Sequence, residues 1–207
     1  MKKLPRSFYT RNDVVLIAKE LLGKVLVTDL DGIKTSGIIT ETEAYAGVID
    51  RASHAWNERR TARTEIMYAT GGSAYVYLCY GIHHLFNVVT NKKNIPHAVL
   101  IRSVEPLEGS EMMLMRRSKP KADYALTTGP GSLSNALGIR VQHTGLDLCG
   151  DRIWIEDRRI QIPGIIESKR IGVEYSGADA KRMYRFYIKD NKWVSKNKSA
   201  RKISLKM

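Results

Sequence analysis

The segment Glu41-Thr42-Glu43-Ala44-Tyr45 carries residue types that could do chemistry. In an extended strand alternate side chains share a face, so Glu41, Glu43 and Tyr45 are predicted to point the same way. Carboxylates are rarely buried without partners. One interpretation is therefore a solvent-facing strand with one or two salt bridges. The other is a general base, in which one carboxylate takes a proton and its neighbour orients it.

Aromatic residues cluster between Tyr75 and Gly81. Alternation along a strand places Tyr75, Tyr77 and Cys79 on one face. Tyr80 falls beside Gly81 at a predicted hairpin tip, where a side chain has few protein neighbours. An aromatic residue in that position can act as a wedge that enters a stack of nucleic-acid bases. The alternative is that these tyrosines are present because aromatic residues favour β-strands.

Two polar residues interrupt strands that are otherwise apolar. Asn87 is predicted to lie inside such a strand, and a buried amide requires hydrogen-bond partners from the backbone or from a ligand. Arg102 lies among apolar neighbours in another strand and requires an anion. The candidate anions are Glu41, Glu43 and a phosphate of a bound ligand.

Histidines and cysteines show no metal-binding spacing. His54 is isolated in a polar loop, where a lone histidine is usually a hydrogen-bonded structural residue. The adjacent His83 and His84 are expected to diverge. Cys79 and Cys149 form neither a CxxC pair nor a disulfide framework, which is typical of a protein in a reducing cytoplasm. We therefore expect no metal and no cofactor.

The elements that must position these residues follow from turn residues and apolar runs. Asp13 and Gly23 bracket a short helix, and an Asp31-Gly32 turn joins strands 24–29 and 37–45 into a hairpin. Further strands are predicted over 74–79, 85–90, 98–104, 153–155, 161–162, 171–173 and 185–188, and helices over 109–117 and 133–137. The predicted fold class is α/β mixed. It is a single β-rich domain with a curved, mainly antiparallel sheet, open-barrel or roll-like, flanked by helices and with a protruding β-hairpin.

Composition limits the class of partner. The 207 residues suit one domain, or at most two small ones. Thirty-four lysines and arginines stand against 21 acidic residues, giving a formal net charge of +13. That excess favours nucleic acid and, less often, an acidic membrane surface; the alternative is a generic basic surface. The longest apolar run, Ala74 to Tyr80, is too short to span a membrane, so we expect an intracellular protein.

In this combination the residues resemble the alkyladenine (3-methyladenine) DNA glycosylases of the human type. The resemblance runs in order from Leu4 to Ser195, with spacings that fit, and its combined motifs are far more specific than a single short pattern. The matching segments are Glu41-Thr42-Glu43-Ala44-Tyr45, residues 50–55, Tyr75-Val76-Tyr77 with Tyr80-Gly81, Asn87, residues 102–109, Thr128-Gly129-Pro130-Gly131, Arg170-Ile171-Gly172-Val173, Arg185-Phe186-Tyr187 and Trp193-Val194-Ser195.

The resemblance implies roles for five residues around the predicted chemistry. Glu43 matches the general base that positions and deprotonates a water molecule, and Arg102 matches the arginine that helps to hold that water. Tyr45, His54 and Tyr77 match the residues that stack around a base flipped out of the duplex. The histidine also contacts the edge of that base in the family.

Three more positions carry implied roles, and a fourth departs from the family. Tyr80 matches the residue that fills the gap left in the duplex. Asn87 matches the asparagine that crowds the amino group of guanine, and the backbone of Val173 matches a segment that touches the water or the base. His83 replaces an aromatic residue often found beside the hairpin tip, so groove contacts there can differ.

We therefore expect a monofunctional DNA glycosylase that flips and excises alkylated or deaminated purines from duplex DNA by attack of water at C1′. The implied substrates are 3-methyladenine, 7-methylguanine, hypoxanthine and ethenoadenine, handled by a cytoplasmic monomer. Residues 1–195 would form the glycosylase domain, and 196–207 a basic tail that either attracts phosphates or is simply solvated. One alternative is a glycoside hydrolase using Glu41 and Glu43, which does not explain the charge. The other is a non-catalytic nucleic-acid-binding module, which leaves Glu43 without a role.

Overall fold

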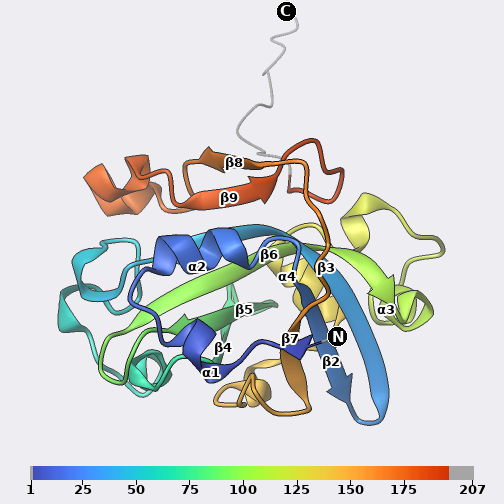
Figure 1. The fold of residues 1–207 in the computed structure, drawn as a ribbon, viewed down its shortest axis with the longest axis horizontal. Coiled ribbons are helices and arrows are strands. Elements are labelled where there is room, and N and C mark those ends of the chain that lie inside the picture. The colour runs from blue at the N-terminus through green and yellow to red at the C-terminus, as the bar shows by residue number, and fades with distance from the viewer. Residues whose placement is uncertain (1, 196–207) are drawn as a thin grey trace, which may run out of the picture.

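A nine-stranded antiparallel sheet dominates the computed structural model, which describes residues 2–195 (Figure 1). The order along its main path is β1-β7-β2-β3-β6-β5-β4, so β1 and β4 are the two ends and the sheet does not close. The strands are β1 (Lys2–Lys3), β2 (Val25–Leu30), β3 (Ile33–Tyr45), β4 (Ala74–Cys79), β5 (His83–Thr90), β6 (His97–Glu108), β7 (Ile153–Asp157), β8 (Ile165–Ser168) and β9 (Arg185–Ile188). The predicted fold class, a β-rich single domain with an antiparallel sheet flanked by helices, is confirmed.

Strand β3 is the centre of the fold and the element that carries the predicted chemistry. One of its edges pairs with β6. The other edge pairs first with β2 and then, over residues 41–43, with β9. The β3–β6 register shifts on both sides of Glu41, and such irregularities re-aim side chains within a ladder. Three separate parts of the chain therefore meet around Glu41 and Glu43.

Two tight turns form where the sequence predicts them. Asp31 and Gly32 both have positive φ, 56° and 73°, and close the β2–β3 hairpin, as expected for an Asp-Gly pair. Tyr80 and Gly81, with φ of 51° and 71°, lie in the turn between β4 and β5. The β4–β5 hairpin is thus confirmed, and β5 begins at His83, two residues earlier than predicted.

Short helices cover the sheet. They are α1 (Arg6–Tyr9), α2 (Val14–Glu20), α3 (Ser110–Arg116) and α4 (Pro130–Ala136). Helix α2 begins where the side chain of Asp13 accepts a hydrogen bond from the backbone N–H of Leu16, 2.9 Å away, which satisfies one free donor at the helix start. Apolar side chains of α2 and α4 join those of β3, β5 and β6 in the main core cluster.

Two predicted strands are wrong. Residues 161–162 and 171–173 form no strand, and β8 lies between them instead, paired with β9. In the second case Gly172 has a φ of 74°, which breaks an extended run, and the N–H of Ile171 bonds to a side chain instead of a neighbouring strand. Residues 171–173 are therefore free to line a cavity.

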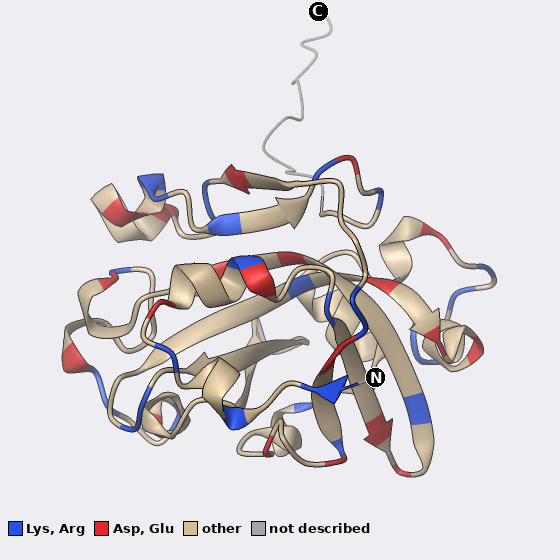
Figure 2. Cartoon of the chain, viewed as in Figure 1, with Lys and Arg blue, Asp and Glu red and all other residues tan. Residues whose placement is uncertain are grey.

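The positive charge is spread over loops and strand ends of the described chain, with acidic residues interspersed (Figure 2). Three arginines, Arg102, Arg170 and Arg185, are buried, but they pair with the buried acids Glu41, Glu43 and Asp50, so the positive excess does not lie inside the fold. The predicted basic tail, 196–207, lies outside the described residues. Within residues 2–195, every helix is too short or too polar to cross a membrane.

Candidate active site

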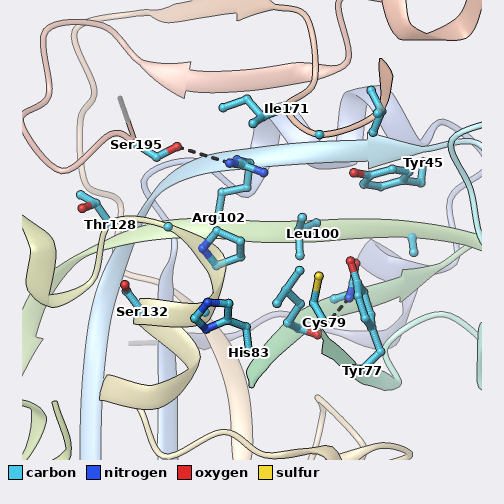
Figure 3. Close-up of a pocket in the computed structure, with 18 of the residues that line it drawn as sticks. Tyr45, Tyr77, Cys79, His83, Leu100, Arg102, Thr128, Ser132, Ile171 and Ser195 are labelled. Carbon is cyan, nitrogen blue, oxygen red and sulfur yellow. Dashed lines mark hydrogen bonds between the residues drawn. The ribbon is translucent and has the colours of Figure 1, made fainter. Parts of the chain in front are cut away.

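A cavity of about 790 Å³ opens beside β3 and is lined by most of the residues singled out in the sequence (Figure 3). Tyr45 and Tyr77 lie on one side of it, and His83 and Ser132 on the other. The alternation predicted for β4 is confirmed, because Tyr75, Tyr77 and Cys79 all line the cavity. The remaining predicted residues that line it are His54, Tyr80, Asn87, Arg102 and Val173.

Glu43 is fully buried and fixed through both carboxylate oxygens. Oε2 accepts a 2.8 Å hydrogen bond from the hydroxyl of Tyr45, and Oε1 accepts one of 2.8 Å from the backbone N–H of Ile171. Nη1 of Arg102 lies 3.2 Å from Oε1. The solvent-facing interpretation of this strand is therefore wrong. Glu43 itself does not line the cavity, but its three partners Tyr45, Ile171 and Arg102 do. The carboxylate is therefore an oriented anion directly behind the cavity wall, a position from which a general base could act.

Tyr45 acts as a permanent donor to that anion. Burial, followed by the charge of Glu43, raises the pKa of Tyr45 well above its ordinary value. The guanidinium of Arg170 lies over its ring, 4.8 Å from the centroid. Arg170 is itself held by a buried two-point pair with Asp50, at 2.5 and 2.8 Å. The pair thus supports both Tyr45 and the segment that follows Arg170.

Glu41 is also fully buried, and its carboxylate is the main anionic partner of Arg102. Nε of Arg102 donates to Oε1 of Glu41 over 2.8 Å, and Nε of Arg185 donates to the same oxygen over 2.6 Å. Burial opposes ionisation of Glu41, but the charges of Arg102 and Arg185 outweigh it and lower the pKa of the carboxyl. Burial likewise opposes the charge on Arg102, yet Glu43 and Glu41 raise its pKa.

His54 joins the aromatic wall. Its Nδ1 lies 2.8 Å from the hydroxyl of Tyr75, and its Nε2 lies 3.1 Å from Nη2 of Arg63. Because arginine can only donate, Nε2 accepts, so Nδ1 carries the proton and donates to Tyr75. Burial, then Arg63 and Arg59, lower the pKa of His54 to about 4. The ring is therefore neutral near pH 7 and packs edge-on against Tyr77, with centroids 4.7 Å apart.

Asn87 and Tyr80 have opposite surroundings. Asn87 is buried, and its Nδ2 donates to the carbonyls of Tyr75 and Leu85, each over 3.2 Å, so the buried amide finds its partners in the backbone. Its side chain is thereby held rigidly at the cavity wall. Tyr80 is 90% exposed at the tip of the β4–β5 hairpin. An exposed ring at a turn is free to contact another molecule.

The segment after β8 differs in detail from expectation. Val173 is buried at the cavity, but its carbonyl accepts from the N–H and the hydroxyl of Ser176, at 2.9 and 2.7 Å. The backbone group that reaches Glu43 belongs to Ile171. Ile171, Arg185 and Ser195 are the residues near the chemistry to which sequence reasoning gave no role. A buried-charge count around Glu41 could have pointed to Arg185; nothing local marks the other two.

Among residues 2–195, no three histidine, cysteine or acidic side chains gather in a way that could hold a metal ion. The donors around the cavity are instead hydroxyls, guanidinium groups and backbone N–H groups. What this arrangement can do is orient a water molecule with one carboxylate, in a cavity whose aromatic rings suit a flat ligand.

Comparison with known proteins gives matches over most of the chain. The family model described as methylpurine-DNA glycosylase matches residues 7–192. A relative in Clostridium acetobutylicum, named "Putative 3-methyladenine DNA glycosylase", is 46% identical over 200 residues, which are 93% of this chain and 97% of that protein. Relatives of the same name in Desulfitobacterium hafniense and Chlamydia felis are 43% and 46% identical over 94% and 89% of this chain, and 99% and 95% of their own lengths. The chain therefore belongs to the methylpurine-DNA glycosylase family, hydrolases that cleave the N-glycosidic bond of damaged purines in DNA.

Proposed function

We propose that this enzyme flips alkylated or deaminated purines out of duplex DNA and releases them by attack of water at C1′, with Glu43 as the general base. The observation that carries the proposal is the buried Glu43 carboxylate, which is oriented by two residues of the cavity wall, Tyr45 and Ile171, behind a cavity lined by rings. An N-glycosidic bond breaks through an oxocarbenium-like sugar. A carboxylate beside C1′ both stabilises that charge and activates water.

Arg102 would help to hold the attacking water. Its Nη1 is 3.2 Å from Glu43, and its side chain borders the cavity. A guanidinium only donates hydrogen bonds, so it presents N–H groups to the lone pairs of a water oxygen. The oxygen would then face the sugar while Glu43 accepts the proton, which leaves the base as the departing group.

The rings of Tyr45, His54 and Tyr77 would receive the flipped base. Extrusion from the duplex costs a few kcal/mol, and each stacking contact returns about 1–3 kcal/mol. Alkylated purines that carry a positive charge gain further from electron-rich tyrosine faces. The backbone around Val173 would close the pocket from the opposite segment, and Tyr80 would fill the gap left in the duplex.

The two alternative functions fit the geometry less well. A glycoside hydrolase would need Glu41 as the acid partner of Glu43, but Glu41 is buried and already accepts hydrogen bonds from two arginines and two serines. A non-catalytic nucleic-acid-binding module gives no reason to bury an oriented carboxylate beside the ligand cavity, where it would repel phosphate.

The test is a duplex oligonucleotide with one lesion, incubated with the enzyme and then treated with alkali or left untreated. Strand breaks only after alkali identify a monofunctional glycosylase acting without a lyase step. Parallel substrates with 3-methyladenine, 7-methylguanine, hypoxanthine or ethenoadenine rank the lesions by rate of release. Size-exclusion chromatography tests the expected monomer. Tight binding without base release from any of the four would refute the proposal.

A further inference from the structure

We propose that Glu41 is a positioning residue for this reaction: it holds Arg102 in the orientation that keeps Glu43 available to water. The inference rests on the proposed function of Glu43 as general base. Glu41 itself cannot take part in proton transfer, because its two oxygens are already filled by donors. These donors are Arg102 Nε (2.8 Å), Arg185 Nε (2.6 Å), Ser103 Oγ (3.0 Å), Ser195 N (2.7 Å) and Ser195 Oγ (2.7 Å).

The donors come from parts of the chain that are far apart, which fixes the carboxylate in space. Ser103 lies on β6, Arg185 on β9 and Ser195 after β9, whereas Glu41 lies on β3. Arg185 also donates to the carbonyl of Ser195 over 3.0 Å. A carboxylate with four such partners cannot rotate without leaving buried donors unpaired, which is costly. Glu41 is therefore a rigid anchor.

Arg102 is divided between the two carboxylates. Its Nε donates to Glu41, its Nη2 lies 3.5 Å from the hydroxyl of Ser195, and its Nη1 approaches Glu43 at 3.2 Å without a well-aligned hydrogen bond. An arginine left with a single carboxylate prefers a two-point pair with both oxygens. Without Glu41, Arg102 would turn onto Glu43, occupy the lone pairs that a water molecule needs and stabilise the charged carboxylate. Glu41 prevents that pairing.

The buried charges balance in this cluster, and the decisive variant must preserve that balance. Glu41 and Glu43 oppose Arg102 and Arg185, so Glu41→Gln alone leaves one positive charge in excess. The double variant Glu41→Gln/Arg185→Met removes one charge of each sign. Arg185→Met alone is its reference. Glu156→Gln is the matched control, because Glu156 is also buried and bonded to an arginine, Arg158, but lies on β7 away from the cavity.

The measurements are single-turnover base release from pH 5 to 8, and separately the Kd for lesion-containing duplex. We expect Glu41→Gln/Arg185→Met to release base about a hundredfold more slowly than Arg185→Met, as for a displaced catalytic group, with Kd within threefold. The acid limb of its pH–rate profile should also move, because Arg102 turns toward the catalytic carboxylate. Ser195→Ala changes no charge and removes one donor to Glu41. It should slow base release several-fold and move the pH–rate profile in the same direction, and it provides this test even if the charge variants fail to fold.

A change in the profile would reflect the turning of Arg102, because the other groups around this cluster keep their charge over this range. Arg102 and Arg170 stay protonated because nearby carboxylates raise their pKa, and burial is the main cause that raises the pKa of Tyr45, Tyr77 and Tyr175. Glu41 is faced by Arg102 and Arg185. A merely structural effect would lower thermal stability, as we expect for Glu156→Gln, without moving the profile.

Three outcomes decide the matter. A slower rate with a shifted acid limb supports the role of Glu41. Rates within threefold of the reference, or a slower rate with an unshifted limb, overturn it. Base release by the unmodified enzyme is measured first: its absence would refute the proposed function itself, whereas an active enzyme with unaffected variants would refute only the role of Glu41.

Discussion

The backbone N–H of Ile171 donates a 2.8 Å hydrogen bond to Oε1 of Glu43, although the two residues are 128 positions apart in the chain. The hydroxyl of Tyr45 binds the other oxygen of the same carboxylate. One donor comes from the same strand and the other from a distant loop. Each oxygen of the carboxylate is therefore held from a different part of the fold. The loop in turn is tied down by the buried pair of Arg170 with Asp50. The orientation of Glu43 is therefore a property of the whole fold.

Glu43→Gln is predicted to reduce single-turnover base release by about 10²- to 10⁴-fold, the usual contribution of a general base. Glutamine keeps the size of the side chain, so binding of lesion-containing duplex should persist. Its amide NH₂ must, however, face either the Tyr45 hydroxyl or the Ile171 N–H, both of which donate in the native site, so a small loss of thermal stability should accompany the change. Near-native turnover by the folded variant would place the chemistry elsewhere.

Tyr45→Phe separates the hydroxyl of this residue from its ring. Removing the hydroxyl takes one donor from Oε2 of Glu43 but leaves the aromatic face at the cavity, so release should slow about tenfold while lesion affinity changes little. The pKa of Tyr45 is raised well above its ordinary value by burial and by Glu43. The ratio of the release rate of Tyr45→Phe to that of the native enzyme should therefore be constant up to pH 9. Tyr68→Phe, which removes a hydroxyl outside the cavity, is the control. Equal rates for Tyr45→Phe and the native enzyme would contradict the prediction.

His54 should make the folded state acid-sensitive. Its pKa falls from 6.5 to about 4 because of burial, then Arg63 and Arg59. Between these values the unfolded chain binds a proton that the folded chain does not. Stability is therefore predicted to fall as the pH drops from about 6.5 to about 4, and to be unaffected by this group above that window.

The measurement is the midpoint of urea unfolding from pH 4 to pH 8 for the native enzyme and for His54→Gln. His84, His97 and His143 also have lowered pKa values, chiefly through burial, and contribute equally to both proteins. The difference between the two curves therefore isolates His54. A difference that does not change with pH would show that the imidazole is not desolvated in solution.

Sequence alone predicted the elements that depend on local signals. Asp13 marked the start of α2, Asp31-Gly32 the first hairpin, and the alternation of Tyr75 and Tyr77 the face that lines the cavity. Each of these rests on capping, turn or pleat geometry, which a short segment determines for itself. The placement of Arg102 among apolar residues also required an anion, and both carboxylates of β3 supply it.

What sequence could not give depends on long-range contacts. Residues 171–173 have the apolar and β-branched content of a strand, but Gly172 has a positive φ and the N–H of Ile171 bonds to Glu43 of β3, a partner 128 positions away. The hydrogen bond from the backbone N–H of Ser195 to Glu41 likewise joins residues that are 154 positions apart. Burial of the Glu41 carboxylate also depends on Arg185 of β9, which is 144 positions away in the chain.

Asn87→Ser tests whether the asparagine is a filter for guanine. The two backbone bonds of Nδ2 prevent the side chain from turning aside, so it can exclude an exocyclic amino group by its bulk. Serine is shorter and should leave hypoxanthine release within a few-fold while making guanine release easier, especially from mispairs. The assay compares both bases in the same duplex context. Equal loss of activity on both would show that the amide is needed only to satisfy the carbonyls of Tyr75 and Leu85.

Tyr80→Ala separates extrusion of the base from bond cleavage. The ring is 90% exposed and projects from the β4–β5 turn, so it has little packing to lose, and its contribution should be to the flipping equilibrium. A loss of about 1.5–3 kcal/mol in that equilibrium corresponds to a roughly ten- to hundredfold slower release. The control is Met115→Ala, which truncates an exposed apolar side chain on a different element, α3, and should leave the rate of base release unchanged.

The partner of the lesion decides how much Tyr80 matters. A lesion in a stable base pair needs the wedge more than one in a mismatch, where unpairing costs less. Tyr80→Ala should therefore slow release most from well-paired lesions, whereas Glu43→Gln should slow release equally from all of them, because the sugar chemistry is the same. The measurement is single-turnover release of one lesion placed opposite a good and a poor partner. If Tyr80→Ala slowed both duplexes by the same factor, the tip of the hairpin would act on binding or on the chemical step and not as a wedge.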